Sequence, residues 1–448
     1  MDDLPPPVIV DILNRLTDST DLARCRRTCK TLNALSYDVD SVNLFCSFNR
    51  YMKSRSPATK SSITPFKTIL TNLIAKLTNL ESVSIGVEKP LRSIPYDDLE
   101  DESDDLYLTD VSFVSAWLPR VSDKLKELSF SDFWIQSCWR RSDVLALISR
   151  HCQRLTVLEV RNAWLSVDGL NPMPSLTSLT LEFIRLDDED LAKVNDCFPC
   201  LQIFNLIGVG GLKEPKILLQ HLKSCQWTVS NAPLSLTVCA PNLVELKLKC
   251  VKPRSLVLQT PLLSDFHLSL EKASVFDIKE PLKLKKFHLM TANLYSLICK
   301  FPFGRTVRSL TLDSLSRVKL AEASNLSLDA LFEVFPNMSC LKLGPTAYSE
   351  IEISFCVQGL EGREGMKELK EFTAHLVVSD TEVSLSFISS VLAKCSNLLY
   401  VALLIHHELD ALIASNLIAR CMAVCPRVRW KWGMWKEGSK DAWLSDGV

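Results

Sequence analysis

The sequence predicts an α/β protein in which short N-terminal helices precede a curved solenoid, a horseshoe whose concave side is a parallel sheet. Three observations lead to this prediction. An apolar triplet recurs along most of the 448 residues, helical apolar stripes fill the longer gaps between triplets, and extended proline-containing segments fill the shorter ones. The apolar content of 47% and charged content of 23% are typical of a chain with a large core.

The recurring triplet has the form L-x-x-L-x-L, with Phe, Val, Ile or Met also allowed. Its last two residues are two apart, so both lie on one face of a short strand. One repeat cannot bury that face alone, but stacked repeats form a continuous apolar column. Most copies start 20 to 31 residues apart, within or just beyond the range of leucine-rich repeats. The copies start at Leu80, Leu125, Leu155, Leu176, Leu201, Leu243, Leu263, Leu284, Val307, Met338, Leu369 and Leu398, with a degenerate copy near Val428.

The segments between triplets predict two kinds of repeat. Gaps of about 30 residues carry stripes at helical spacing, such as Ile388, Val391 and Leu392. Gaps of 20 to 23 residues, such as the one containing residues 251–261, have no room for a helix. We therefore expect helical repeats at both ends and tighter, β-like repeats in the middle. The 42-residue gap after Leu201 is twice 21, which predicts a worn repeat around Trp227–Leu236.

Boundaries follow from this pattern. We expect a docking module over residues 1–45, a linker and start of the array over 46–75, about 13 to 14 repeats over 76–428, and a C-terminal cap over 429–448 that contains Trp430 and Trp432. The segment Arg50–Lys67 is rich in basic, hydroxyl and proline residues, which is typical of a solvated linker. The acidic insertion Tyr96–Asp110 predicts a solvated loop.

The N-terminal module predicts three short helices. Pro7 suits a first helical position, Ile9, Ile12, Leu13 and Leu16 form an apolar stripe, and Asp18 or Ser19 can cap a second helix that carries Leu22. Three short helices bury too little to be stable alone, so part of the stripe must dock against something else.

These residues, with Leu4-Pro5, Arg24-Cys25-Arg26 and Cys29-Lys30, resemble the F-box. An F-box followed by leucine-rich repeats resembles the substrate receptors of SCF-type ubiquitin ligases, a combination familiar in plants. The resemblance implies that the chain binds a Skp-type adaptor and, through it, a cullin. It implies that the adaptor contacts are Leu4, Pro5, Ile9, Ile12, Leu13, Leu16 and Leu22. The alternative is that the stripe packs only against the first repeats.

The outward positions of the strands predict where a target protein binds. Strand alternation places Lys247, Lys249, His267, Lys286 and His288 on the concave face, on neighbouring strands, with Arg161 further along it. Basic and titratable side chains in one place favour an acidic or phosphorylated target segment, or a bound polyphosphate. The alternative is that these residues are simply the polar surface of exposed strands.

Several functions are disfavoured. A formal net charge of −1 gives no general attraction to nucleic acid or to a membrane surface. Cys197 and Cys200 form a lone C-x-x-C without a second pair, and His406-His407-Glu408 lacks the spacing of a metal site. We expect no cofactor, no catalytic residue, and a location in the nucleus or cytoplasm. The apolar run Leu398–Ile405 is too short to cross a bilayer.

The sequence thus favours a non-catalytic substrate receptor that holds a target near a ubiquitin-charged enzyme. Two alternatives remain open: a non-degradative scaffold that binds partners through its repeats, and an F-box receptor that senses a small ligand in its concave cavity.

Overall fold

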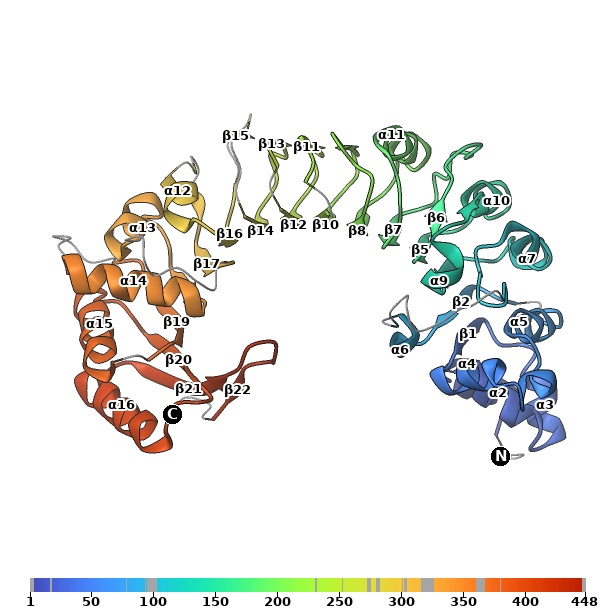
Figure 1. Ribbon diagram of the computed structural model, residues 1–448, viewed down its shortest axis with the longest axis horizontal. Helices are drawn as coiled ribbons and strands as arrows, with labels where there is room; N and C mark the ends of the chain where they lie inside the picture. The colour runs from blue at the N-terminus through green and yellow to red at the C-terminus, as the bar shows by residue number, and fades with distance from the viewer. Residues whose placement is uncertain are drawn as a thin grey trace. The chain divides into compact units, whose positions relative to one another are not determined.

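The computed structural model describes residues 4–16, 18–77, 79–92, 94, 103–229, 232–251, 253–271, 275–278, 283–299, 301, 304–315, 326–359, 367–378 and 380–444. The chain forms two compact units, Met1–Pro241 and Asn242–Val448. In both, parallel strands alternate with return segments, so each unit is a stack of leucine-rich repeats (Figure 1).

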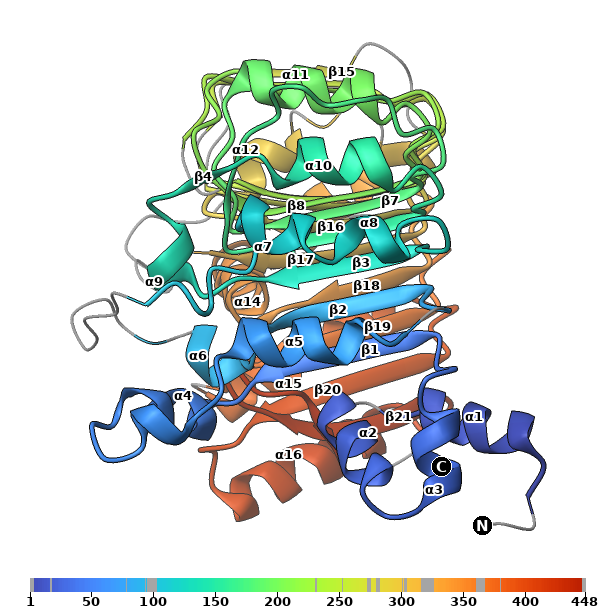
Figure 2. The ribbon, with the colours of Figure 1, turned by 90° about the vertical axis from the view of Figure 1, so that its right-hand side faces the viewer.

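The first unit begins with three helices and continues as a parallel sheet in the strand order β1-β2-β3-β5-β7-β8-β10 (Figure 2). Its helices are α1 (Pro6–Asn14), α2 (Ser19–Arg26), α3 (Lys30–Leu35), α4 (Phe48–Arg55), α5 (Phe66–Ile74), α6 (Lys89–Arg92), α7 (Val111–Ser115), α8 (Leu118–Val121), α9 (Trp134–Ser137), α10 (Val144–His151) and α11 (Asp188–Cys197). Its strands are β1 (Ser41–Cys46), β2 (Ser82–Val87), β3 (Glu127–Ser131), β4 (Arg141–Ser142), β5 (Val157–Arg161), β6 (Trp164–Leu165), β7 (Ser178–Glu182), β8 (Ile203–Val209), β9 (Lys216–Leu218), β10 (Ser224–Val229) and β11 (Ser235–Cys239).

The second unit continues the same pattern with parallel strands in the order β12-β14-β16-β17-β18-β19-β20-β21. Its strands are β12 (Glu245–Cys250), β13 (Ser255–Gln259), β14 (Asp265–Leu270), β15 (Val275–Ile278), β16 (Lys286–Thr291), β17 (Ser309–Ser314), β18 (Cys340–Leu343), β19 (Glu371–Leu376), β20 (Tyr400–His406), β21 (Arg429–Trp435) and β22 (Ala442–Trp443). Its helices are α12 (Leu294–Cys299), α13 (Leu328–Val334), α14 (Pro345–Gln358), α15 (Thr381–Lys394) and α16 (Ala411–Val424).

The register of the strands shows how the triplets form the core. In the first unit the middle triplet residues pair directly from strand to strand, and all of them are buried. This column runs through Val42, Val83, Leu128, Leu158, Leu179, Phe204 and Cys225. In the second unit the equivalent buried column runs through Leu246, Phe266, Phe287, Leu310, Leu341, Phe372, Val401 and Trp430. The predicted stacking of triplets is confirmed.

The two kinds of repeat are also confirmed. Helices such as α10 and α11 cover one face of the sheet in the first unit, and α12 to α16 do so in the second (Figure 1). Between them in sequence, short strands replace the helices: β9 pairs with β11 in the first unit, and β13 with β15 in the second. The sheet face opposite these return segments is called the open face below.

The worn repeat lies slightly earlier than predicted. Its strand is β10, and Cys225 and Trp227 fill the two inward positions. Leu236, which we expected to belong to it, instead lies in β11 on the return side. The triplet is difficult to detect because Cys225 and Trp227 occupy positions where the motif normally has Leu, Phe, Val, Ile or Met. Both side chains are nevertheless buried and continue the column.

The N-terminal boundary differs from the prediction. The sheet begins at β1, inside the range expected for the docking module, and β1 pairs with β2 along its full length. The expected linker Arg50–Lys67 contains most of α4 and the start of α5. The docking module therefore passes directly into the array.

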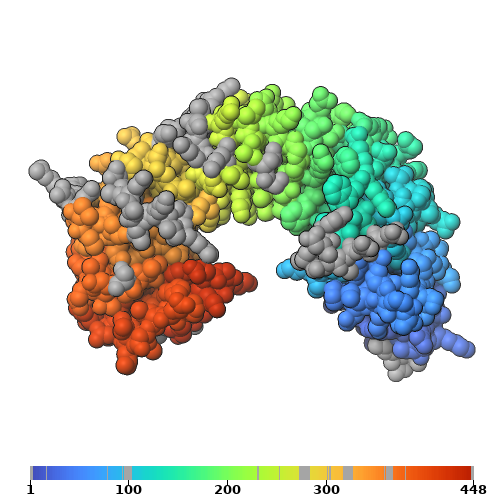
Figure 3. Space-filling model, viewed as in Figure 1, coloured from blue at the N-terminus to red at the C-terminus, as the bar shows by residue number. Residues whose placement is uncertain are grey.

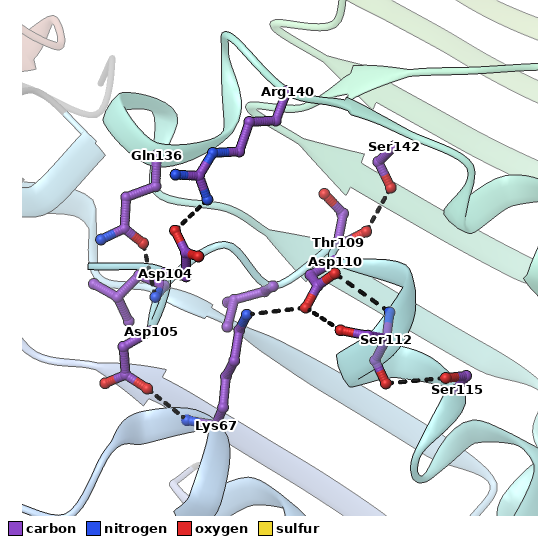
Figure 4. A network of polar contacts seen from close by, with 12 residues as sticks. Lys67, Asp104, Asp105, Thr109, Asp110, Ser112, Ser115, Gln136, Arg140 and Ser142 are labelled. Carbon is purple, nitrogen blue, oxygen red and sulfur yellow. Dashed lines mark hydrogen bonds and ion pairs between the residues drawn. The ribbon is translucent and has the colours of Figure 1, made fainter. Parts of the chain in front are cut away.

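The acidic insertion is built into the fold where the structure describes it. Asp105 accepts hydrogen bonds from the backbone N–H groups of Phe66 and Lys67 at 2.7 and 3.1 Å, at the start of α5. Asp110 pairs with the Lys67 ammonium at 3.4 Å, and Asp104 pairs with Arg140 (Figure 4). The prediction of a solvated loop is wrong for this part. The other acidic residues of the insertion, Asp97, Asp98, Glu100, Asp101 and Glu102, lie outside the described residues.

The C-terminal aromatic residues belong to one more repeat. β21 pairs with β20 in parallel, and β22 pairs with β21 in the antiparallel direction. Trp430 and Trp432 are buried, with their ring centroids 5.6 Å apart. Both indole rings thus lie in the core at the end of the array.

Candidate functional site

The three N-terminal helices form because their ends are well defined in the sequence. α1 starts at Pro6, one residue earlier than predicted, where a missing N–H costs nothing. The Asp18 carboxylate accepts a hydrogen bond from the Thr20 N–H at 2.8 Å and caps α2, as expected. Ile9, Leu13 and Leu22 are buried among the three helices.

Helix α1 is apolar on a second face, which is open to solvent. Leu4, Val8 and Ile12 are 40%, 43% and 40% exposed and follow one another at four-residue spacing; Val8 and Ile12 lie on α1, and Leu4 lies two residues before it. We call these three residues the docking stripe. Pro5 is also exposed, and Leu16 is half-buried. The α1–α3 helices lie at the end of the first unit (dark blue in Figure 3).

The residues implied as adaptor contacts therefore fall into two groups. Leu4, Pro5 and Ile12 are accessible, whereas Ile9, Leu13 and Leu22 form the module's own core. Sequence reasoning missed Val8, although its position midway between Leu4 and Ile12 was a usable signal. The buried group supports the stripe without presenting itself to a partner.

The module is hydrogen-bonded to the first strand of the sheet. The Asn14 side-chain oxygen accepts from the Asp40 N–H at 3.0 Å, just before β1. The Ser19 hydroxyl accepts from the Asn43 N–H, within β1, at 2.9 Å. An edge strand otherwise leaves such N–H groups unpaired. The module thus covers the free edge of the first repeat.

A second candidate surface is a row of side chains on the open face of the second unit. The strand register places Lys247 beside His267, then His288, Thr311 and Lys342. We call these five residues the central row. The imidazole centroids of His267 and His288 are 5.1 Å apart. The predicted alternation brings Lys247, His267 and His288 together.

Carboxylates on the same face reduce the positive charge around this row. Lys247 pairs with Glu245 at 2.7 Å, and Asp265 lies 3.1 Å from the His267 imidazole and 3.6 Å from the Lys286 ammonium. Burial, with the charges of His267 and Lys342, lowers the pKa of His288 to about 4, so His288 is neutral at pH 7. In the described part of the chain, Lys249 and Lys342 form no ion pair and carry the available positive charge.

Arg161 is not part of the central row. It lies on β5 in the first unit, where its guanidinium is 2.8 Å from Glu182 and 3.4 Å from Glu159. Two carboxylates on the same open face therefore neutralise it. On the second unit, Lys286 contacts the carboxylate of Asp265, its register partner on β14. Neither Arg161 nor Lys286 is therefore a free cation.

Within the described ranges, no group of three or more His, Cys, Asp or Glu side chains could hold a metal ion. Cys197 and Cys200 are free thiols, and burial raises the pKa of the Cys197 thiol. Among the helices that the structure describes, none is both long and apolar enough for a bilayer.

An N-terminal three-helix module followed by stacked leucine-rich repeats defines a two-part class of repeat protein. Residues 1–42 match the F-box-like domain family. Over 449 aligned residues, which cover 99% of this chain and 100% of the relative, the sequence is 53% identical to the F-box/LRR-repeat protein At4g29420 of Arabidopsis thaliana. The chain belongs to the F-box/LRR-repeat protein family, whose members are generally non-catalytic adaptors.

Proposed function

We propose that this protein is the substrate-recognition subunit of an SCF (Skp-cullin-F-box) E3 ubiquitin ligase, acting in the nucleus or cytoplasm. The docking stripe binds a Skp-type adaptor that joins a cullin, and the open face of the repeats binds a target protein. The bound target is then held close to a ubiquitin-charged enzyme, so the chain itself needs no catalytic residue.

The observation that carries this proposal is that α1 is apolar on two faces. One face, with Ile9 and Leu13, is buried in the module, and the other presents Leu4, Val8 and Ile12 to solvent. An apolar arc this wide on a helix is normally covered by another element along its whole width. The docking stripe is therefore the surface that a partner polypeptide would cover.

Replacing Val8 and Ile12 by aspartate should abolish capture of a recombinant Skp-type adaptor. Two buried carboxylates in an apolar interface should weaken binding by about 100-fold or more, roughly 2.7 kcal/mol. Because both side chains are exposed in the free chain, its thermal unfolding midpoint should not change. Biolayer interferometry with immobilised adaptor measures the first effect and differential scanning fluorimetry the second.

The matched control is Leu412→Asp, which places the same charge at an 82% exposed leucine on α16. It should leave adaptor binding unchanged. Leu13 is unsuitable as a test position, because aspartate there would disrupt the buried core of the module. Equal adaptor binding by the Val8 and Ile12 variant and by the wild type would rule out the docking stripe.

For the target, we propose that the central row and Lys249 contact an acidic or phosphorylated segment. Support comes from the positions of Lys249 and Lys342, which have no carboxylate partner in the described part of the chain, on either side of two imidazoles. A phosphate or carboxylate placed there would gain charge-assisted hydrogen bonds.

Reversing the charge of Lys249 and Lys342 to glutamate should reduce target capture about tenfold or more. The measurement is quantitative affinity capture from cells with the Val8 and Ile12 variant as bait, because this bait holds targets without delivering them to the ligase. The control bait reverses Lys283 and Lys285, two exposed lysines of the same unit that precede β16. Loss of the same proteins from both baits would point to net charge and contradict a role for the row.

A further inference from the structure

The first unit contains a cavity that the proposed function does not use. It has a volume of about 730 Å³, within the range of ligand pockets. It lies where the strands β5, β7 and β8 end, and we call it the edge pocket. The lining residues that matter here are Arg92, Arg161, Trp164, Phe183, Arg185 and Gly208.

Three adjacent repeats build the edge pocket from equivalent positions. The strand register aligns Arg161 with Glu182 and then Ile207. The next residue in each repeat, Asn162, Phe183 and Gly208, has a positive φ of 57°, 54° and 65°. The same left-handed turn therefore occurs three times in succession, and it directs the following residues around the mouth of the pocket.

Phe183 is the unusual member of this series. Bulky side chains rarely adopt a positive φ, and such residues concentrate at functional sites. The ring is 58% exposed, so burial does not compensate for the backbone conformation. It lies against Gly208, where a Cβ atom would be 2.7 Å from the ring. The fold thus holds a solvent-exposed aromatic ring against the backbone of Gly208, in the lining of the edge pocket.

Among the described residues, those that line the edge pocket carry an excess of positive charge. The charged ones are three arginines and one glutamate. Arg161 is paired with that glutamate, Glu182, whereas the exposed guanidinium of Arg185 lies 5.2 Å from the centroid of the Trp164 ring. Short parallel bridges from Trp164 to Arg185 and from Arg185 to Gly210 fix the backbone of these residues. Burial and the charge of Arg161 lower the pKa of Arg92, so an anion beside these two arginines would be stabilising.

We propose that the edge pocket binds an extended peptide of the target protein in which an aromatic side chain lies next to an acidic one. The aromatic side chain packs against Phe183 and Trp164, and the carboxylate pairs with Arg185. A peptide fits better than a small free ligand, because the exposed Phe183 ring extends the apolar surface beyond the cavity. This inference rests on the proposed function, since it names the chemistry of the target.

The test is selection from a phage-displayed library of random peptides on the purified full-length chain. Peptides with Trp, Tyr or Phe beside Asp or Glu should be enriched. Their binding should fall about tenfold or more for Phe183→Gly and for Arg185→Glu. Phe183→Gly removes the ring and relieves the positive φ, so the thermal unfolding midpoint, measured on the same variant, should change little.

Trp139→Ala is the control, because Trp139 is a 71% exposed aromatic residue of the same unit that does not line the pocket. It should leave peptide binding unchanged. Enrichment without the aromatic–acidic pairing, or unchanged binding by Phe183→Gly, would overturn the inference. Adaptor binding is measured on the same variants and does not depend on the pocket. If the wild type captured no adaptor, the proposed function would fail, whatever the peptides show.

Discussion

Replacing Trp227 by alanine is expected to lower the free energy of unfolding by about 3–5 kcal/mol. Trp227 is fully buried on β10, where it pairs with Leu206 on β8 and continues the inward positions of the first unit. Removing the indole leaves a large cavity between two repeats, and neighbouring repeats stabilise one another only through such contacts. Urea unfolding followed by circular dichroism measures the loss.

Two controls separate the lost volume from other effects. Trp227→Phe keeps most of the apolar volume and removes an indole N–H that has no hydrogen-bond partner in the described part of the chain, so its cost should be much smaller. Trp139→Ala, at an exposed position, should change stability by no more than about 0.5 kcal/mol. A loss below about 1 kcal/mol for Trp227→Ala would show that β10 does not join the stack.

Replacing Gly211 by alanine is expected to lower the free energy of unfolding by about 3 kcal/mol or more. Gly211 has a φ of +97°, which costs an L-residue roughly 1–2 kcal/mol. An added Cβ would also lie only 2.4 Å from the backbone oxygen of Leu186 in the preceding repeat. The two repeats approach closely here because the Leu186 N–H donates to the Gly210 oxygen at 3.1 Å.

Gly169→Ala provides the matched control in the same unit. Gly169 has a φ of +72°, but an added Cβ there would meet only the Ala146 Cβ, at 3.9 Å. It should therefore lose the conformational part alone, about 1–2 kcal/mol. The difference between the two variants in urea unfolding isolates the steric part. If both lost the same free energy, the close approach of the repeats at Gly211 would be contradicted.

The repeats were predictable because strand alternation and stacking impose a strict chemical pattern on the sequence. The start of the array was not. Val39, Val42 and Leu44 match the triplet and are buried. Val39 lies 41 residues before Leu80, a gap similar to two others in the series, but these residues fall within the segment assigned to the docking module, where short helices were expected.

The docking stripe could be predicted only in part. Val8, Ile9, Val10, Ile12 and Leu13 form an apolar arc over more than half of the circumference of α1, opposite Asp11 and Asn14. Helical periodicity identifies this arc but not which part of it is buried, so the sequence could not separate the buried Ile9 and Leu13 from the exposed Val8 and Ile12.

The sequence predicts where charged side chains lie on the strands, but not which residues they pair with. Glu245 and Lys247 are two residues apart on one strand, so their pairing could have been foreseen. The contacts of Asp105 with the start of α5, and of Asp132 with Leu108, join segments 39 and 24 residues apart. Such contacts depend on how the insertion packs against distant segments of the chain, and local sequence does not predict this packing. Burial raises the pKa of Asp132 to about 7, a consequence that only the three-dimensional arrangement reveals.

The hydrogen bonds that Asn14 and Ser19 accept from the backbone at the start of the first strand have a mechanical consequence. A module on a flexible tether would leave a bound partner free to take many orientations, whereas a module hydrogen-bonded to the sheet edge fixes the partner's orientation relative to the first repeats. Inserting one repeat into the first unit would shift the strands of that unit beyond the insertion by about 4.8 Å, the distance between neighbouring strands. Under the proposed function, the number of repeats would then help to decide which lysines of a target receive ubiquitin.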